Sequence, residues 1–370
     1  MTAYIVRRLL FMVPTLLGIM LVSFVVVQFA PGGPVERVIA QLTGSDTGAT
    51  SRISGSPGGD FGARGQPGSA TIDSVSSKYR GAQGLDPEFI KSLEKQFGFD
   101  KPAYQRFFLM LWNYARFDFG KSYFRDTTVL QLIKEKLPVS ISLGIWLTLL
   151  TYLISIPLGI RKAINDGSQF DVWTSGAIIV GYAIPGFLFA ILLIILFAGG
   201  SFFNFFPLRG LTSEGWALLP WYSKILDYFW HLVLPIISMG LAAFATMTLL
   251  TKNSFLDEIR KQYVLTARAK GNSERQVLYG HVFRNAMLIV IAGFPGAFVH
   301  AFFSGSLLIE TIFSLDGIGL LGFESVLNRD YAVVFATLYI LSLVGLMVNL
   351  ISDLTYTWVD PRIDFETREV

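Results

Sequence analysis

The chain has 370 residues, of which 52% are hydrophobic and 15% are charged, whereas roughly a quarter of the residues in a soluble domain are charged. Because the apolar residues gather in long stretches without Asp, Glu, Lys or Arg, a soluble single-domain protein is excluded. The 30 basic and 27 acidic residues leave a net charge of +3, which does not indicate a nucleic-acid partner. The lack of cysteine excludes disulfide scaffolds, iron–sulfur clusters and thiol catalysis.

Six charge-free runs are long enough to cross a bilayer, since about 20 helical residues span its hydrocarbon core. These runs cover residues 9–35, 137–160, 172–208, 228–251, 285–309 and 331–352. The third run is too long for one simple crossing, so we expect its span to end near Gly199 and residues 202–208 to lie at the interface. The sequence predicts an all-α polytopic membrane protein with six transmembrane helices.

Basic residues beside the spans predict the orientation. On the side of the two chain ends, 13 basic residues flank the spans, Arg7, Arg8 and Lys162 among them, and the short opposite loops hold three. Both termini are therefore expected in the cytoplasm. The first apolar segment, residues 9–30, is longer than a signal-peptide core and is expected to be an uncleaved anchor.

Four regions follow from this topology. They are an N-terminal transmembrane anchor (1–30), a periplasmic insertion (31–136), a transmembrane core (137–358) and a cytoplasmic tail (359–370). Within the insertion, residues 43–84 are rich in Gly and Ser and predict an irregular loop. Residues 86–125 predict short helices, because Pro87 and Pro102 each precede an apolar stripe with helical spacing, and Gly98 ends the first stripe.

Residues 253–284, between the fourth and fifth spans, predict a helical hairpin. One face of its first helix carries Phe255, Ile259, Tyr263 and Ala267. Gly271 breaks that helix, and Ser273 with Gln276 forms a capping box that starts the second. The apolar side of the second helix carries Val277, Leu278, His281 and Val282. Such a hairpin either docks into a groove of a partner or rests on anionic lipid.

The sequence offers little chemistry of its own. Gly120-Lys121-Ser122 is not a phosphate-binding loop, because Ala115 stands where that loop requires glycine. His231, His281 and His300 are too far apart in sequence to predict a metal site. The spans contain no ionisable Asp, Glu, Lys or Arg, which disfavours an ion-coupled carrier.

Glycine and proline interrupt several spans. These positions are Pro157 with Gly159, Gly181 with Pro185 and Gly186, Pro235, and Gly293 with Pro295 and Gly296. In membrane helices they serve packing or permit kinks that open and close a pathway.

Short motifs occur in a fixed order along nearly the whole chain. They are Arg7-Arg8-Leu9, Phe97-Gly98-Phe99-Asp100-Lys101-Pro102, Phe117-Asp118-Phe119-Gly120-Lys121-Ser122, Tyr263 to Gly271, His281-Val282-Phe283-Arg284-Asn285-Ala286, Glu310-Thr311-Ile312-Phe313, Arg329-Asp330-Tyr331 and Asp360-Pro361-Arg362. In this order they resemble the permease subunits of binding-protein-dependent ABC importers of the dipeptide and oligopeptide class. The Gly-rich insertion before Arg80-Gly81 and the run 140–162 resemble the Yej-type subgroup, which implies import of peptides, including the peptide-nucleotide antibiotic microcin C.

The resemblance implies a division of labour in the bacterial inner membrane. A periplasmic peptide-binding protein delivers the substrate, and this chain forms the path by alternating access together with a second, homologous permease. Two ABC ATPase subunits, or one fused ATPase, supply the energy. This chain is then not an enzyme and binds no cofactor, since ATP and Mg²⁺ belong to the ATPase subunits.

The resemblance also assigns the hairpin as the ATPase-coupling loop. The residues expected to couple are Ile259, Tyr263, Thr266, Ala267, Arg268, Ala269, Lys270, Gly271, His281, Arg284 and Asn285. We expect Tyr263, Ala267 and Gly271 to pack against the ATPase cleft. The wider family begins this loop with Glu-Ala-Ala, and the aligned positions here are Leu265, Thr266 and Ala267.

For the substrate path, polar residues near the outer halves of the spans are the candidates: Tyr182, Asn204, Ser304 and Glu310. Two alternative functions stay open. One is uptake of another solute, such as nickel or a sugar, on the same architecture, for which His231 and His300 are the only histidines near the path. The other is a channel or carrier that works without an ATPase.

Overall fold

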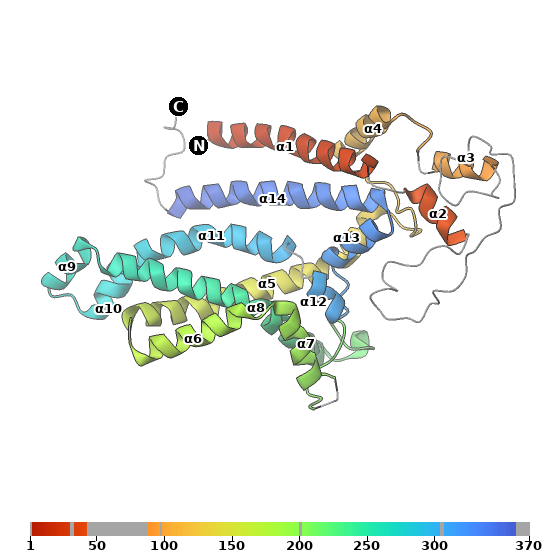
Figure 1. Cartoon of the computed structure of the whole chain (residues 1–370). Helices are drawn as coiled ribbons and strands as arrows, with labels where there is room; N and C mark the ends of the chain where they lie inside the picture. The colour runs from red at the N-terminus through yellow and green to blue at the C-terminus, as the bar shows by residue number, and fades with distance from the viewer. Residues whose placement is uncertain are drawn as a thin grey trace. The chain divides into compact units, whose positions relative to one another are not determined.

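The computed structural model describes residues 2–29, 33–42, 87–96, 98–199, 202–303 and 307–359. The expected loop 43–84, Ser304 and the tail from residue 360 lie outside the described residues. In chain order the helices are α1 (Thr2–Phe29), α2 (Pro34–Leu42), α3 (Pro87–Gln96), α4 (Ala103–Ala115), α5 (Val129–Ile164), α6 (Gln169–Ala183), α7 (Gly186–Phe197), the short η1 (Trp216–Leu218), α8 (Trp221–Ile259), α9 (Gln262–Ala269), α10 (Glu274–Val277), the π-helix η2 (Leu278–Val282), α11 (Phe283–Phe303), α12 (Leu307–Ile312), α13 (Ile318–Leu327) and α14 (Tyr331–Val359). Within the described ranges, extended pairing is limited to one bridge between Lys121 and Thr128, so the all-α prediction is confirmed (Figure 1).

Five helical segments are long and apolar enough to cross a membrane. They are Tyr4–Phe29, Val129–Ile164, Trp221–Ile259, Glu274–Phe298 and Tyr331–Thr355. A sixth crossing results if α6 and α7 count as one broken span, which gives the six spans that the charge-free runs predict.

The broken span differs from a simple crossing helix. α6 and α7 are bent by 96° relative to each other, and the break falls at Ile184 and Pro185. Pro185 has no backbone N–H and its ring disfavours a helical conformation for the preceding residue, so α6 ends before it. The Gly181, Pro185 and Gly186 cluster was one of the expected kink sites, and here the kink is a complete interruption.

The described chain divides into two compact units, each assembled from separate segments. Unit 1 lies within Met1–Met12, Lys134–Leu321 and Leu341–Val370, and unit 2 within Val13–Ile133 and Gly322–Ile340. Helices α1, α5, α13 and α14 have residues in both units.

Unit 1 is built around α5, α7, α8 and α12. One of its core clusters includes Leu143, Ala190, Leu232, Ile309 and Phe313. α1 and α14 also meet within this unit, where the Tyr4 hydroxyl donates a 2.9 Å hydrogen bond to Asp353 and Arg8 forms an ion pair with the same carboxylate. α9 and α10 lie together at one end of α8 and α11 (Figure 1).

Unit 2 contains the short helices of the insertion. As the sequence predicts, α3 begins at Pro87, Gly98 follows it with a positive φ of 73°, and α4 begins directly after Pro102. The Gly120-Lys121-Ser122 segment is a structural loop, as expected, and carries the isolated bridge from Lys121 to Thr128. Its Ser122 hydroxyl donates to Asp330, whose other carboxylate oxygen accepts from the Tyr123 amide at 3.2 Å.

Candidate functional site: the helical hairpin

The hairpin consists of α9, α10 and η2 between the ends of α8 and α11. Its turn is made by Gly271 with φ of 82°, a conformation that residues with a Cβ rarely adopt. The capping box is confirmed: the Ser273 hydroxyl accepts from the Gln276 amide, and the Gln276 side chain accepts from the Ser273 amide at 2.9 Å. The first helix is interrupted at Arg260 and Lys261, so the expected continuous face belongs to two helices, α8 and α9.

An apolar core holds the hairpin to the helices that bear it. Its buried members are Ile160, Ala163, Met247, Phe255, Val264, Ala267, Val277, Val282, Ala286, Met287 and Val290. Phe255 and Val264 are fully buried, and Ala267 is 6% exposed. Ala267, which we expected at the partner surface, therefore lies in the core of the hairpin itself. Because this core joins α9 and α10 to α5, α8 and α11, a force on the hairpin acts directly on those helices.

The second helix of the hairpin departs from the expected apolar side. Val277 and Val282 are buried and Leu278 is partly buried, but His281 is exposed. Residues 278–282 form a π-helix, whose extra residue per turn shifts the register between Val277 and Val282. The placement of His281 on the apolar side was therefore wrong.

Most of the expected coupling residues lie on the outside of the hairpin. The exposed ones are Thr266, Arg268, Ala269, Lys270, Gly271, His281, Arg284 and Asn285, and the partly buried ones are Ile259 and Tyr263. Residues 253–284 contain six basic and three acidic side chains. The outer surface is therefore predominantly basic and is held by a well-packed interior.

Polar contacts fix the entry to the hairpin. The Tyr263 hydroxyl donates a 2.7 Å hydrogen bond to Glu258 Oε2, and Lys261 pairs with the same carboxylate. Burial raises the pKa of Tyr263, the nearby Glu258 carboxylate raises it further, and a hydrogen bond with Asn285 opposes this rise. Across the turn, Arg268 forms a 3.0 Å ion pair with Glu274 and so links α9 to α10.

The expected substrate-path residues that the structure describes lie on three different segments. Tyr182 is 62% exposed on α6, and Asn204 is exposed in the connection after α7. Glu310 is buried in α12 at 2% exposure. Near the α6–α7 break, a mainly apolar cavity of about 240 Å³ is lined by Ile184, Gly186, Phe187, Ser238, Met239, Leu241, Ala242, Leu307, Leu308 and Ile309. The role of the four residues in transport stays a prediction.

Glu310 organises the turn that follows α12. Its Oε2 accepts a 2.7 Å hydrogen bond from the amide of Leu320 in the first turn of α13, where a carboxylate also complements the helix dipole. A Cβ on Gly317 would lie 2.5 Å from Glu310 Oε1, so the turn passes against the carboxylate only because residue 317 is glycine. The carboxylate thus has a structural partner in this conformation.

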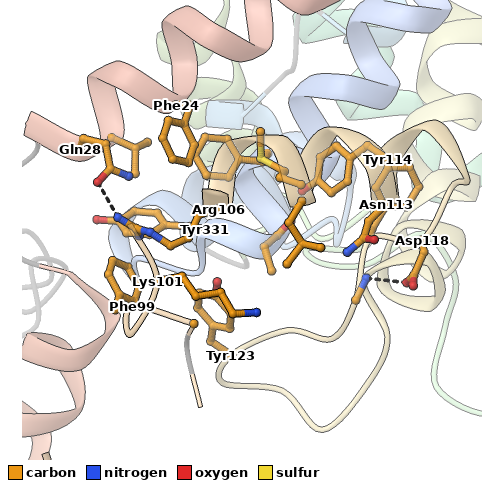
Figure 2. Close-up of a pocket in the computed structure, with 18 residues that line it drawn as sticks. Phe24, Gln28, Phe99, Lys101, Arg106, Asn113, Tyr114, Asp118, Tyr123 and Tyr331 are labelled. Carbon is orange, nitrogen blue, oxygen red and sulfur yellow. Dashed lines mark hydrogen bonds between the residues drawn. The ribbon is translucent and has the colours of Figure 1, made fainter. Parts of the chain in front are cut away.

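A second concave site lies within unit 2 and was not predicted from the sequence. Figure 2 shows this cavity of about 240 Å³, with side chains from the end of α1, from α4, from the loop after it and from the start of α14. Arg106 forms one wall: it donates a 2.9 Å hydrogen bond to Gln28 and lies 4.4 Å from the ring centre of Phe99. Lys101 and Asp118 also line the cavity, which therefore presents both charges between aromatic walls.

A comparison with models of protein families identifies the family of the chain. A family model described as the binding-protein-dependent transport system inner membrane component matches residues 155–365, which is more than half of the chain. The chain belongs to this family. The matched region contains the whole hairpin, the α6–α7 break and the Glu310 turn.

Full-length relatives agree with the family model. The chain is 69% identical to the peptidoglycan transport system permease protein YejB of Agrobacterium fabrum and 58% identical to the inner membrane ABC transporter permease protein YejB of Escherichia coli O157:H7, each over 100% of both chains. It is 32% identical to the oligopeptide transport system permease protein AppB of Bacillus subtilis, over 99% of this chain and 100% of that one. A chain of the solved MetNI methionine ABC transporter, in an inward-facing conformation, matches with a TM-score of 0.45 and 13% identity over 62% of this chain and 97% of that chain. The Yej-type resemblance is confirmed by the first two relatives.

Proposed function

We propose that this chain is the membrane-spanning permease subunit of an ATP-driven importer for peptides. The observation that carries the proposal is the full-length identity of 69% and 58% to two YejB permeases, in a family described as a component of binding-protein-dependent transport. A relative named for oligopeptide transport supports peptides over nickel or a sugar. ATP hydrolysis then takes place in separate subunits, and the chain supplies the path.

The hairpin is the proposed contact for the ATPase. Its outer surface carries exposed Arg268, Lys270, Arg284 and His281, and a basic surface favours docking on an acidic groove. Its interior is tied to three long helices through one apolar core. A push on the hairpin is therefore transmitted to the spans. Alternating access requires that the ATPase contact the hairpin differently in the two states of the transporter.

This assignment implies an orientation in the membrane and a set of partner proteins. The hairpin and both termini face the cytoplasm of a bacterium, and the insertion between α1 and α5 faces the periplasm, in accordance with the excess of basic residues near the hairpin. A second permease completes the path, two ATPase subunits or one fused ATPase drive it, and a periplasmic peptide-binding protein delivers the cargo. Microcin C belongs to the cargo that the Yej-type resemblance implies.

A second cargo is favoured by one observation. The relative with 69% identity is named as a peptidoglycan transport permease. Peptidoglycan fragments carry short peptides, so they belong to the same chemical class as peptide cargo. The two cargoes are distinguished by uptake of a labelled tripeptide and of a labelled peptidoglycan fragment into cells with and without the chain.

Affinity purification from native membranes tests the ATPase contact. We expect the tagged chain to retain an ATPase and a second permease, and a Lys270→Glu, Arg284→Glu variant to lose the ATPase but keep the permease, because only the exposed charge of the hairpin is reversed. Lys91→Glu, Lys95→Glu on α3 is the matched control and is expected to retain both partners. Purification of the wild-type chain without an ATPase would instead favour a channel or carrier.

A further inference from the structure

Lys162, near the end of α5, is fully buried, which is rare for lysine unless it is paired. Its ammonium group donates hydrogen bonds to three acceptors on α6: the Asp171 carbonyl at 3.0 Å, Thr174 Oγ1 at 2.7 Å and Ser175 Oγ at 2.8 Å. These contacts use all three ammonium protons, and Asp171 Oδ1 lies 2.9 Å away as the counter-ion. One lysine therefore fastens the first turns of α6 to α5, although the sequence indicated only an orienting charge at this position.

Asp171 is shared with a second lysine. Its Oδ2 accepts a 2.7 Å hydrogen bond from Lys252 of α8, and Lys252 also lies 3.0 Å from Asp166 in the turn before α6. The side chains of Lys162, Asp171 and Lys252 are 0%, 8% and 13% exposed. Each buried charge therefore has an opposite charge beside it, as buried ions require, and the exposed Arg260 adds a further cation 3.7 Å from Asp166 at the surface of the cluster.

The same end of α8 is joined to the hairpin. Phe255, one turn after Lys252, lies in the hairpin core, and the Ser254 hydroxyl donates a 2.6 Å hydrogen bond to the Ala286 carbonyl of α11. Lys252 is thus an ionic link between α6 and the end of α8 that bears the hairpin.

At its other end, α6 leads into the break and α7. Gly186, the first residue of α7, lies against α8, because a Cβ there would be 3.0 Å from the Ser238 carbonyl oxygen. Gly186 and Ser238 also line the cavity near the break. A displacement of α6 therefore reaches that cavity through α7.

We propose that Lys162, Asp171 and Lys252 are positioning residues that make the α6–α7 segment follow α8 and the hairpin during transport. Separating any one of these charges would leave it unpaired at a buried site, so the cluster resists sliding of α6 along α8. The inference rests on the proposed function, because the hairpin is taken as the part that the ATPase moves. An ion cluster that only stabilises the fold would not alter how much peptide moves for each ATP.

The test uses the assembled transporter in proteoliposomes, with peptide uptake and ATP hydrolysis measured on the same samples. Lys252→Met removes the ionic link from α8 to α6 but leaves Asp171 paired with Lys162. Lys252→Arg keeps a cation at this position. Lys224→Met, the same substitution near the other end of α8, is the control. The Lys224 ammonium group lies over an aromatic ring, 5.3 Å from the ring centre of Trp216, and not in the ion cluster with α6.

We expect the Lys252→Met transporter to keep its ATPase and its ATP hydrolysis but to move about tenfold less peptide per ATP, in the usual range of coupling between two sites. Lys252→Arg should recover most of this loss, and Lys224→Met should match the wild type. A wild-type ratio of peptide moved to ATP hydrolysed in Lys252→Met would overturn the proposal that the ion cluster makes α6–α7 follow α8. A wild-type transporter that moves no peptide, or that purifies without an ATPase, would instead contradict the proposed function.

A distance measurement tests whether α6 follows the hairpin if the Lys252→Met transporter does not assemble. Because the chain lacks cysteine, two variants with a pair of cysteines each, at exposed Arg275 and Trp358 or at exposed Arg275 and Trp173, take spin labels only at those positions in this chain. In the otherwise wild-type transporter, adding a non-hydrolysable ATP analogue should change the distance from the hairpin label at 275 to residue 358 of α14, but not to residue 173 of α6. A change in the distance from residue 275 to residue 173 would show that α6 does not follow the hairpin and would overturn the proposal.

Discussion

Gly159 of α5 and Thr251 of α8 are so close that a Cβ on Gly159 would lie 2.6 Å from the Thr251 Cβ. The same Cβ would be 2.8 Å from the carbonyl oxygen of Thr248. Both distances are shorter than van der Waals contact, so the two helices reach this separation only with glycine at position 159. Small residues permit such close helix crossings in membranes.

Replacing Gly159 by alanine should destabilise the protein, because the added methyl group meets backbone as well as side-chain atoms. We expect a loss of about 1–3 kcal/mol, typical of an overpacked site, measured as a lower unfolding temperature in detergent. Gly176→Ala on α6 is the control, since no atom lies within 4 Å of a Cβ there, and alanine favours a helix over glycine by about 1 kcal/mol. Equal unfolding temperatures for the two variants would contradict the close crossing.

The Glu310 turn gives a second prediction. Gly317→Ala should destabilise unit 1, because the new methyl group would displace the Glu310 carboxylate from the Leu320 amide. Glu310→Ala should also destabilise it, since it removes the acceptor at the start of α13, by about 1 kcal/mol or more. The double variant should lose less than the sum of the two single changes. Thermal unfolding of all three variants measures this coupling, and strict additivity would show that the two residues act independently.

Val264 and Leu265 are neighbours with opposite environments in the hairpin. Val264 is 0% exposed and Leu265 is 53% exposed. Val264→Ala should loosen the hairpin by about 1–3 kcal/mol through a cavity in its core, whereas Leu265→Ala should have little effect. Hydrogen exchange of residues 262–282 measures the difference, and faster exchange in Leu265→Ala than in Val264→Ala would contradict the assigned core.

Tyr123 of unit 2 gives a prediction about pH. Burial raises the pKa of Tyr123 to about 12, with a further contribution from the Asp330 charge. The folded state therefore favours the neutral hydroxyl, so this stabilisation is complete below the ordinary tyrosine pKa of about 10 and is lost as the pH rises towards about 12. The tyrosinate absorbance of wild type minus that of Tyr123→Phe should titrate near pH 12. A difference that titrates near pH 10 would show that the hydroxyl is exposed.

Local rules explain what was predicted well. The capping box of Ser273 and Gln276 and the turn at Gly271 depend on residues three or four apart, so their spacing in the sequence identifies them. The spans are equally visible because their apolar composition is a property of one segment. The face of the first hairpin helix was only partly predicted. Its four-residue spacing ran through the break at Arg260, and fully buried Val264 was missed.

Tertiary contacts account for what the sequence concealed. Lys162 was counted among the orienting charges, and nothing near it in sequence indicated that Lys252 would meet the same aspartate. The unit 2 cavity joins Phe24 and Tyr331, which lie on helices at opposite ends of the chain. The exposed position of His281 follows from a π-helix that the hydrophobic pattern did not predict.

The π-helix also has a consequence for insertions and deletions in the chain. One π turn accommodates one residue more than an α-helix would need at the same place. Deleting one residue from 278–282 would restore an α-helix. It would also rotate α10, which directly precedes this segment, by about 100° around the axis of α11. Val277 would then leave the core of the hairpin, although no other residue had changed. The length of this segment is therefore as strictly determined as the identity of its buried side chains.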